Sequence, residues 1–235
     1  MRRYLIVDDN RAFAENLAEI LRDEGHEAFV AISGAEALRL VAGRQFDALI
    51  TDMKMPVMGG AQLVHEIRRV DPGLAAIVIT AYTGQDDLTG AKHEGILAVL
   101  PKPVPIPHLM SLLRVARRDG LVALVEDDLS LSDNLVEALR DHGFTSLTAT
   151  SAVEVERLGG VRPFAALVDL RLPGSPQGEA LSRLAERFRG LPIIVITGFP
   201  NLVPAVKSLR VFQKPFDTQQ LLETLEHLHR PGASR

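Results

Sequence analysis

The chain has 235 residues, which is longer than most single domains and predicts two domains of about 100 to 150 residues each. Apolar residues make up 46% and charged residues 24%, as in ordinary globular proteins, and the absence of cysteine excludes disulfides, thiolate metal sites and cysteine nucleophiles. A formal net charge of -4 argues against direct nucleic-acid binding. The sequence has no apolar run of about 18 residues, so the chain is expected to be cytoplasmic and to have no membrane contact.

The first half of the chain alternates short β-branched runs with amphipathic helical patterns. Strands are expected at 4–7, 27–30, 48–51, 76–80 and 97–100, and helices near 11–24, 34–43, 59–70, 85–94 and 105–118. The strands are apolar throughout rather than alternating, which is typical of a parallel sheet covered on both faces and joined by right-handed crossovers. This half therefore predicts a doubly wound α/β domain with five strands.

The second half repeats the pattern of the first. Strands are expected at 122–125, 146–149, 165–169, 192–197 and 210–212. Equivalent residues lie 117 or 118 positions apart as far as Thr197, but Lys214 follows its counterpart Lys102 by only 112. The repeat predicts domains at 1–118 and 119–235, the second with a shortened fourth helix near 201–209, where Pro204 further limits helix formation.

Acidic side chains follow the first and third strands of each half. In an open parallel sheet the ligand site lies at the carboxyl ends of the strands, so these acids are expected to meet a threonine and a lysine from the last two strands. Three crowded carboxylates repel one another unless a hard divalent cation joins them, and Mg²⁺ is the expected ion. The expected sets are Asp8, Asp9, Asp52, Thr80 and Lys102 in the first half and Glu126, Asp127, Asp169, Thr197 and Lys214 in the second.

Each of these residues, taken alone, also has a structural explanation. Asp8 or Asp9 can cap the first helix, and Asp52 can serve as a turn residue. Thr80 alone is typical of a β-branched strand residue, and Lys102 alone is typical of a solvated surface charge. The recurrence of the whole ordered set in the second half favours the functional interpretation.

Four short motifs recur in the same order in both halves. They are "LIVDDN" and "LVEDDL" for the acidic pair, "TDMKMPVMGG" and "VDLRLPG" for the third strand, "VITA" and "VITG" for the threonine, and "PKPV" and "QKPF" for the lysine-proline pair. This set resembles the receiver domains of bacterial two-component response regulators, and the resemblance covers nearly all of the chain. It implies two tandem flavodoxin-like receiver domains in which each lysine-proline bond is cis.

By this resemblance, Asp52 and Asp169 accept a phosphoryl group from a phosphohistidine on a histidine kinase or a histidine phosphotransfer protein. The chain is then expected to be a phosphoacceptor rather than an enzyme, with at most self-catalysed phosphorylation and dephosphorylation. Its output is expected to pass through a downstream protein partner.

The resemblance also implies roles for the other site residues. Lys102 and Lys214 contact a phosphoryl oxygen, and Thr80 and Thr197 donate a hydroxyl to it. Magnesium is held in the first domain by Asp9, Asp52, the carbonyl of Lys54 and, through water, Asp8. The corresponding groups of the second domain are Asp127, Asp169, the carbonyl of Arg171 and Glu126.

The second half departs from the family pattern in its spacing. Its lysine arrives five residues early, and its acceptor loop places Gly178 one residue later than Gly60. Valine stands at Val99 and Val211, where the family often has an aromatic switch residue. An alternative function is therefore a scaffold or homodimer in which the second domain docks partners without being phosphorylated.

A third interpretation is a phosphatase of the haloacid dehalogenase class, which also combines an aspartyl nucleophile with threonine and lysine. That class carries a second acid two residues after the nucleophile. Lys54 and Arg171 stand at those positions, which disfavours the phosphatase.

Overall fold

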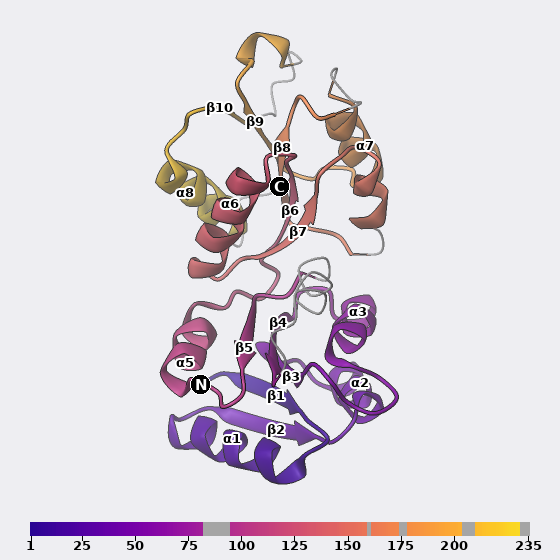
Figure 1. The fold of residues 1–235 in the computed structure, drawn as a ribbon, viewed down its shortest axis with the longest axis vertical. Helices are drawn as coiled ribbons and strands as arrows, with labels where there is room; N and C mark the ends of the chain where they lie inside the picture. Colours follow the sequence, from indigo (N-terminus) through magenta and orange to yellow (C-terminus); the bar gives the residue numbers. More distant parts are fainter. Residues whose placement is uncertain (82–94, 159–160, 174–177, 204–209, 231–235) are drawn as a thin grey trace. The chain divides into compact units, whose positions relative to one another are not determined.

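The computed structural model describes residues 1–81, 95–158, 161–173, 178–203 and 210–230. The chain divides into two compact units, Met1–Asp119 and Gly120–Arg235 (Figure 1). The predicted helix at 85–94 lies outside the described residues, as does most of the segment at 201–209. None of the helices in the described ranges is long and apolar enough to cross a lipid bilayer.

The first unit is built on a parallel sheet with the strand order β2-β1-β3-β4-β5. Its strands are β1 (Arg3–Val7), β2 (Glu27–Ala31), β3 (Ala48–Asp52), β4 (Ala75–Thr80) and β5 (Ala98–Pro101). Its described helices are α1 (Arg11–Asp23), α2 (Gly34–Gly43), α3 (Gly60–Val70) and α5 (Ile106–Val115). Helices α1 and α5 share a core with Ile6 and Ile50, whereas α2 and α3 share one with Leu5 and Leu49, so the sheet is buried on both faces.

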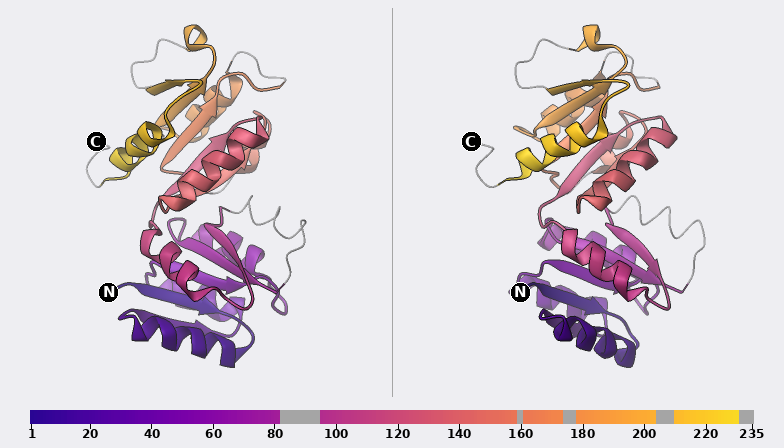
Figure 2. Two further views of the ribbon diagram at one scale, coloured as in Figure 1. Left: turned by 60° about the vertical axis from the view of Figure 1, so that its left-hand side comes forward. Right: turned by 90° about the vertical axis from the view of Figure 1, so that its left-hand side faces the viewer.

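The second unit has the same topology, with the strand order β10-β9-β8-β6-β7. Its strands are β6 (Leu121–Val125), β7 (Thr145–Ala149), β8 (Ala165–Asp169), β9 (Ile193–Thr197) and β10 (Arg210–Gln213). Its described helices are α6 (Leu129–Asp141), α7 (Glu179–Arg187) and α8 (Thr218–His229), with the 3-10 helices η1 (Glu154–Leu158) and η2 (Pro200–Leu202). Helices α6 and α8 lie side by side on one face of this sheet (Figure 2).

Each predicted strand is found within one residue of its expected ends. The predicted helix at 105–118 is shorter in the structure, because α5 ends at Val115. The residues that follow bond elsewhere: the Asp119 amide donates to the Gly73 carbonyl at 2.8 Å, and the Arg118 guanidinium donates to Asp71 at 2.6 Å. These contacts draw the chain away from the helix axis.

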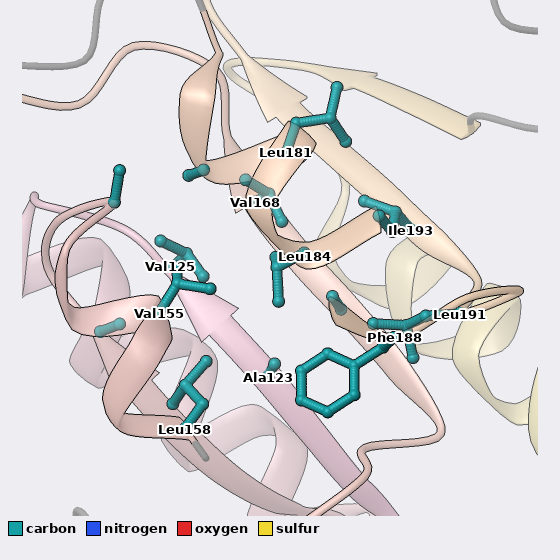
Figure 3. Close-up of a cluster of buried hydrophobic side chains, with 14 of the residues drawn as sticks. Ala123, Val125, Val155, Leu158, Val168, Leu181, Leu184, Phe188, Leu191 and Ile193 are labelled. Carbon is teal, nitrogen blue, oxygen red and sulfur yellow. The ribbon is translucent and has the colours of Figure 1, made fainter. Parts of the chain in front are cut away.

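The two units differ most in the connection after their second strand. Both connections begin with the same kind of cap: a serine hydroxyl, of Ser33 or Ser151, accepts the amide of the glutamate three residues later. The carboxylate of that glutamate accepts the amide of the residue before the serine. The first cap opens the ten-residue α2, whereas the second opens only the five-residue η1. Two glycines follow η1 in the sequence and disfavour further helix. The short helix still covers the sheet, since Val155 and Leu158 pack with Leu184 of α7 over Val125 (Figure 3).

Candidate functional site

The predicted residues of the first unit meet at the carboxyl edge of its sheet. Asp8 follows β1 and Asp52 ends β3, and both are buried, with 2% and 8% of their surface exposed. The ammonium of Lys102, which follows β5, lies 2.7 Å from Asp8 Oδ2 and 3.1 Å from Asp52 Oδ1. Thr80 ends β4 and is buried, and its carbonyl accepts the Lys102 amide at 2.8 Å. The parallel topology thus joins side chains that lie far apart in the sequence.

The first helix is capped by Asn10 and by neither of the adjacent acids. Asn10 Oδ1 accepts the amide of Phe13 at 3.1 Å, and the Asn10 amide in turn donates to Asp8 Oδ1 at 2.9 Å. The interpretation of Asp8 or Asp9 as a helix cap is therefore wrong. The cap instead orients the Asp8 carboxylate toward the site.

A tight loop after β3 supports the strand end that carries Asp52. The Gly60 amide donates to the Met53 carbonyl at 2.8 Å, and a Cβ on Gly60 would lie only 2.3 Å from the Asp52 carbonyl oxygen. A three-residue turn precedes it, with the Met58 amide bonded to the Pro56 carbonyl and Val57 at a φ of 69°. The left-handed region is costly for a β-branched residue, so the surrounding contacts must hold this loop in place.

The charges of the first site are strongly coupled. Burial raises the pKa of the Asp52 carboxyl, and the neighbouring Lys102 ammonium only partly offsets this. Burial acts to lower the pKa of Lys102, but its hydrogen bonds to Asp8 and Asp52 outweigh that effect and leave the pKa raised. The lysine is therefore a fixed positive charge beside Asp52.

The second site repeats this arrangement with a tighter lysine bridge. The Lys214 ammonium lies 2.7 Å from Glu126 Oε2 and 2.7 Å from Asp169 Oδ2. Burial raises the pKa of the Glu126 carboxyl, and Lys214 partly offsets the shift. Thr197 is fully buried, and its Oγ1 accepts the amide of Phe199 at 3.0 Å. All of these predicted residues again lie at the carboxyl ends of the strands.

Each unit holds a carboxylate triad that fits a hard divalent cation. In each triad, one carboxylate oxygen from every acid lies within 4.8 Å of one oxygen of the other two. The first triad is Asp8, Asp9 and Asp52, and the second is Glu126, Asp127 and Asp169. Carboxylate oxygens are the ligands that hard cations such as Mg²⁺ take. The backbone carbonyls of Lys54 and Arg171 stay predicted ligands.

The structure also brings in aromatic residues that sequence reasoning did not assign to the site. Phe13 of α1 places its ring centroid 4.4 Å from the Lys102 ammonium. In the second unit, the Arg171 guanidinium lies 4.3 Å from the ring centroid of Phe199. No sequence signal marked either aromatic residue, because Phe13 fits the apolar pattern of its helix and Phe199 follows a strand. The predicted lysine-proline geometry is confirmed, since Lys102-Pro103 and Lys214-Pro215 are both cis.

Replacing Glu126 with glutamine is expected to stabilise the second unit at neutral pH, with a gain that shrinks as the pH falls toward 4.5, the ordinary pKa of glutamate. A carboxyl with a raised pKa in the folded chain contributes stability that is present at low pH and is lost as the pH rises through the folded pKa. Glutamine mimics the protonated form at every pH. Hydrogen exchange of β6 and β8 amides across this range, in EDTA, measures the difference. A gain that grows on acidification would contradict the prediction, and Glu223→Gln on the exposed side of α8 is the matched control.

Comparison with known proteins identifies the first unit. The family model described as "Response regulator receiver domain" matches residues 4–114. A "Response regulator receiver protein" of Anaeromyxobacter sp. (strain Fw109-5) is 63% identical over 230 residues, which cover 98% of this chain and 96% of that protein. The family model does not extend over the second unit.

Other similar proteins share only part of the chain. The transcriptional regulatory protein GlrR of Escherichia coli K12 is 38% identical over 128 residues, which cover 54% of this chain and 26% of GlrR. A response regulator receiver domain protein (CheY-like) from Methanospirillum hungatei JF-1 has a solved structure with a TM-score of 0.47 and 29% identity, covering 48% of this chain and 91% of that one.

Proposed function

Because the chain belongs to the response regulator receiver family of two-component systems, we propose that it is a phosphoacceptor signalling protein with Asp52 as its principal acceptor. The observation that carries this proposal is that the Lys102 ammonium bridges two members, Asp8 and Asp52, of a cluster of three carboxylates. The donor is proposed to be a phosphohistidine on a histidine kinase or a histidine phosphotransfer protein.

In the proposed reaction, an Asp52 oxygen attacks the phosphorus, the new oxygen–phosphorus bond forms, and the nitrogen–phosphorus bond to the donor imidazole breaks. Lys102 then shifts from the carboxylate to a phosphoryl oxygen, where its point charge stabilises the product. Thr80, at the adjacent strand end, donates its hydroxyl to a second phosphoryl oxygen. Mg²⁺ would be held by Asp9, Asp52, the Lys54 carbonyl and, through water, Asp8, and would neutralise the crowded negative charge.

We extend the proposal to Asp169 as a second acceptor, with residues 1–118 and 119–235 as the two receiver domains. Its support is the equivalent placement of Glu126, Thr197 and Lys214. The magnesium ligands there would be Glu126, Asp127, Asp169 and the Arg171 carbonyl. No observation on the described residues favours the scaffold alternative, in which the second unit docks partners without being phosphorylated.

The remaining parts of the proposal concern partners and location. The signal is proposed to pass to a downstream protein partner. The chain is proposed to act in the cytoplasm, and the homodimer is the oligomer to test for. The expectation of no direct nucleic-acid contact stays a prediction; GlrR is named a transcriptional regulatory protein, but the match spans about a quarter of it.

Treatment with a small phosphodonor and Mg²⁺ is expected to add one phosphoryl mass at Asp52, and a second where Asp169 also reacts. Intact-mass measurement followed by peptide mapping identifies the acceptors, and size-exclusion chromatography records any change of oligomeric state. EDTA is expected to prevent uptake, because uncompensated carboxylates repel the donor. Absence of an adduct at both sites with Mg²⁺ present would overturn the proposal, whereas an adduct at Asp52 alone would leave the second unit as a docking module.

A further inference from the structure

Phe13 stands on the first turn of α1 and presents its ring to the Lys102 ammonium, with Nζ 4.4 Å from the ring centroid. We propose that Phe13 is a positioning residue for phosphoryl transfer at Asp52. It holds the Lys102 ammonium where it serves first the acceptor carboxylate and then the transferred phosphoryl group. The inference rests on the proposed function of Asp52.

The ring is held in place by the same contacts that build the acidic site. The Phe13 amide donates to the Asn10 cap at 3.1 Å, and Asn10 is itself bonded to Asp8 at 2.9 Å. The side chain also packs against the core shared by α1 and α5. Asn10 therefore fixes both the direction of the Asp8 carboxylate and the position of the Phe13 ring. The carboxylate and the ring both contact the Lys102 ammonium.

A lysine at this position needs a partner that does not compete with the phosphoryl group. Its long side chain has many rotamers, and an ordered ammonium must be held by its contacts. Lys102 donates a hydrogen bond to Asp8 at 2.7 Å and forms an ion pair with Asp52 at 3.1 Å. The face of the Phe13 ring attracts the positive charge of Lys102. The ring is not a conventional hydrogen-bond acceptor, so it leaves the N–H groups of the ammonium to oxygen acceptors. Phe13 can thus keep Lys102 in place while the bond to Asp52 is exchanged for one to a phosphoryl oxygen.

The second unit provides an internal comparison. Leu131 follows Asp127 by four residues, as Phe13 follows Asp9, and its amide bonds to the cap Asp128 at 3.1 Å. Leucine offers no ring face. Lys214 is instead bridged at 2.7 Å to both of its carboxylates. The aromatic contact therefore distinguishes the first lysine from the second at an equivalent place in the fold.

The test uses the full chain with Asp169→Ala, so that added mass reports Asp52 alone. The rate of phosphoryl uptake is measured against concentration of a small phosphodonor in Mg²⁺ for Phe13→Leu and Phe13→Tyr. Loss of a partly desolvated cation–π contact is expected to lower the maximal rate about fivefold in Phe13→Leu, with the half-saturating donor concentration unchanged. Phe13→Tyr, which keeps the ring face, is expected to restore the rate.

Phe29→Leu is the matched control, since this partly buried ring of β2 contacts Phe46 and Arg44 rather than the lysine. It is expected to leave uptake unchanged. A second readout does not need the chemistry: the ring face should shift the NMR signals of the Lys102 methylene protons upfield, and Phe13→Leu should abolish that shift.

The outcomes separate the inference from the function on which it rests. Normal uptake at Asp52 in Phe13→Leu, or Lys102 signals that do not respond to that change, would overturn the positioning role. No uptake at Asp52 with Phe13 intact would instead overturn the proposed function. A slowed rate that tyrosine rescues, together with the lost upfield shift, supports the inference.

Discussion

Asp52→Asn is expected to eliminate phosphoryl uptake in the first unit, by on the order of a thousandfold or more, because the amide cannot replace the carboxylate nucleophile. The variant keeps the shape of the side chain. It also removes the negative charge whose burial raises the pKa of Asp52. The chain is therefore expected to stay folded while losing only its acceptor.

The measurement is intact mass after treatment with a small phosphodonor and Mg²⁺, with Asp169→Asn as the matched variant of the second unit. If both acceptors react, each single variant keeps one adduct and the double variant keeps none. An adduct that peptide mapping places in the first unit of Asp52→Asn would show that another residue of that unit accepts the group. Asp47→Asn, at the opposite end of β3 from the acceptor, is the control for a carboxylate of the same unit.

Gly60→Ala is expected to destabilise the first unit by about 3 kcal/mol and to slow phosphoryl uptake at Asp52. An added Cβ would lie 2.3 Å from the Asp52 carbonyl oxygen and 3.1 Å from the Met53 Cα. These atoms belong to the backbone of the acceptor strand, so a side-chain rotation cannot relieve the collision. The strand end or the start of α3 must move, and either displacement changes the position of the acceptor relative to Lys102.

The chain offers a selective probe for this prediction. It has no tryptophan, and both of its tyrosines, Tyr4 and Tyr82, lie in the first unit, so tyrosine fluorescence in urea follows that unit alone. Gly43→Ala is the matched control, because nothing lies within 4 Å of a Cβ at that helix end. It is expected to change stability by less than about 1 kcal/mol. Equal stability for the two variants would show that the loop is not as tight as these contacts require.

The strands of both units could be predicted because most of them are continuously apolar, as is typical of a parallel sheet covered on both faces. The same topology placed Asp52, Thr80 and Lys102 at one edge before any contact was known. The connection after β7 was less predictable. Its amphipathic pattern and its cap resemble those of α2, but the helix stops after five residues where glycines follow.

By itself, the sequence determined the repeated units, the strand ends that carry the acidic and basic residues, and the early arrival of Lys214. Only the tertiary structure decided that Asn10 caps α1 and that Phe13 faces Lys102. The reason is that periodicity specifies which face of an element is buried, whereas side-chain pairing depends on how elements pack. Lys102 and Asp8 are 94 residues apart, and no local pattern encodes the 2.7 Å between their charged groups.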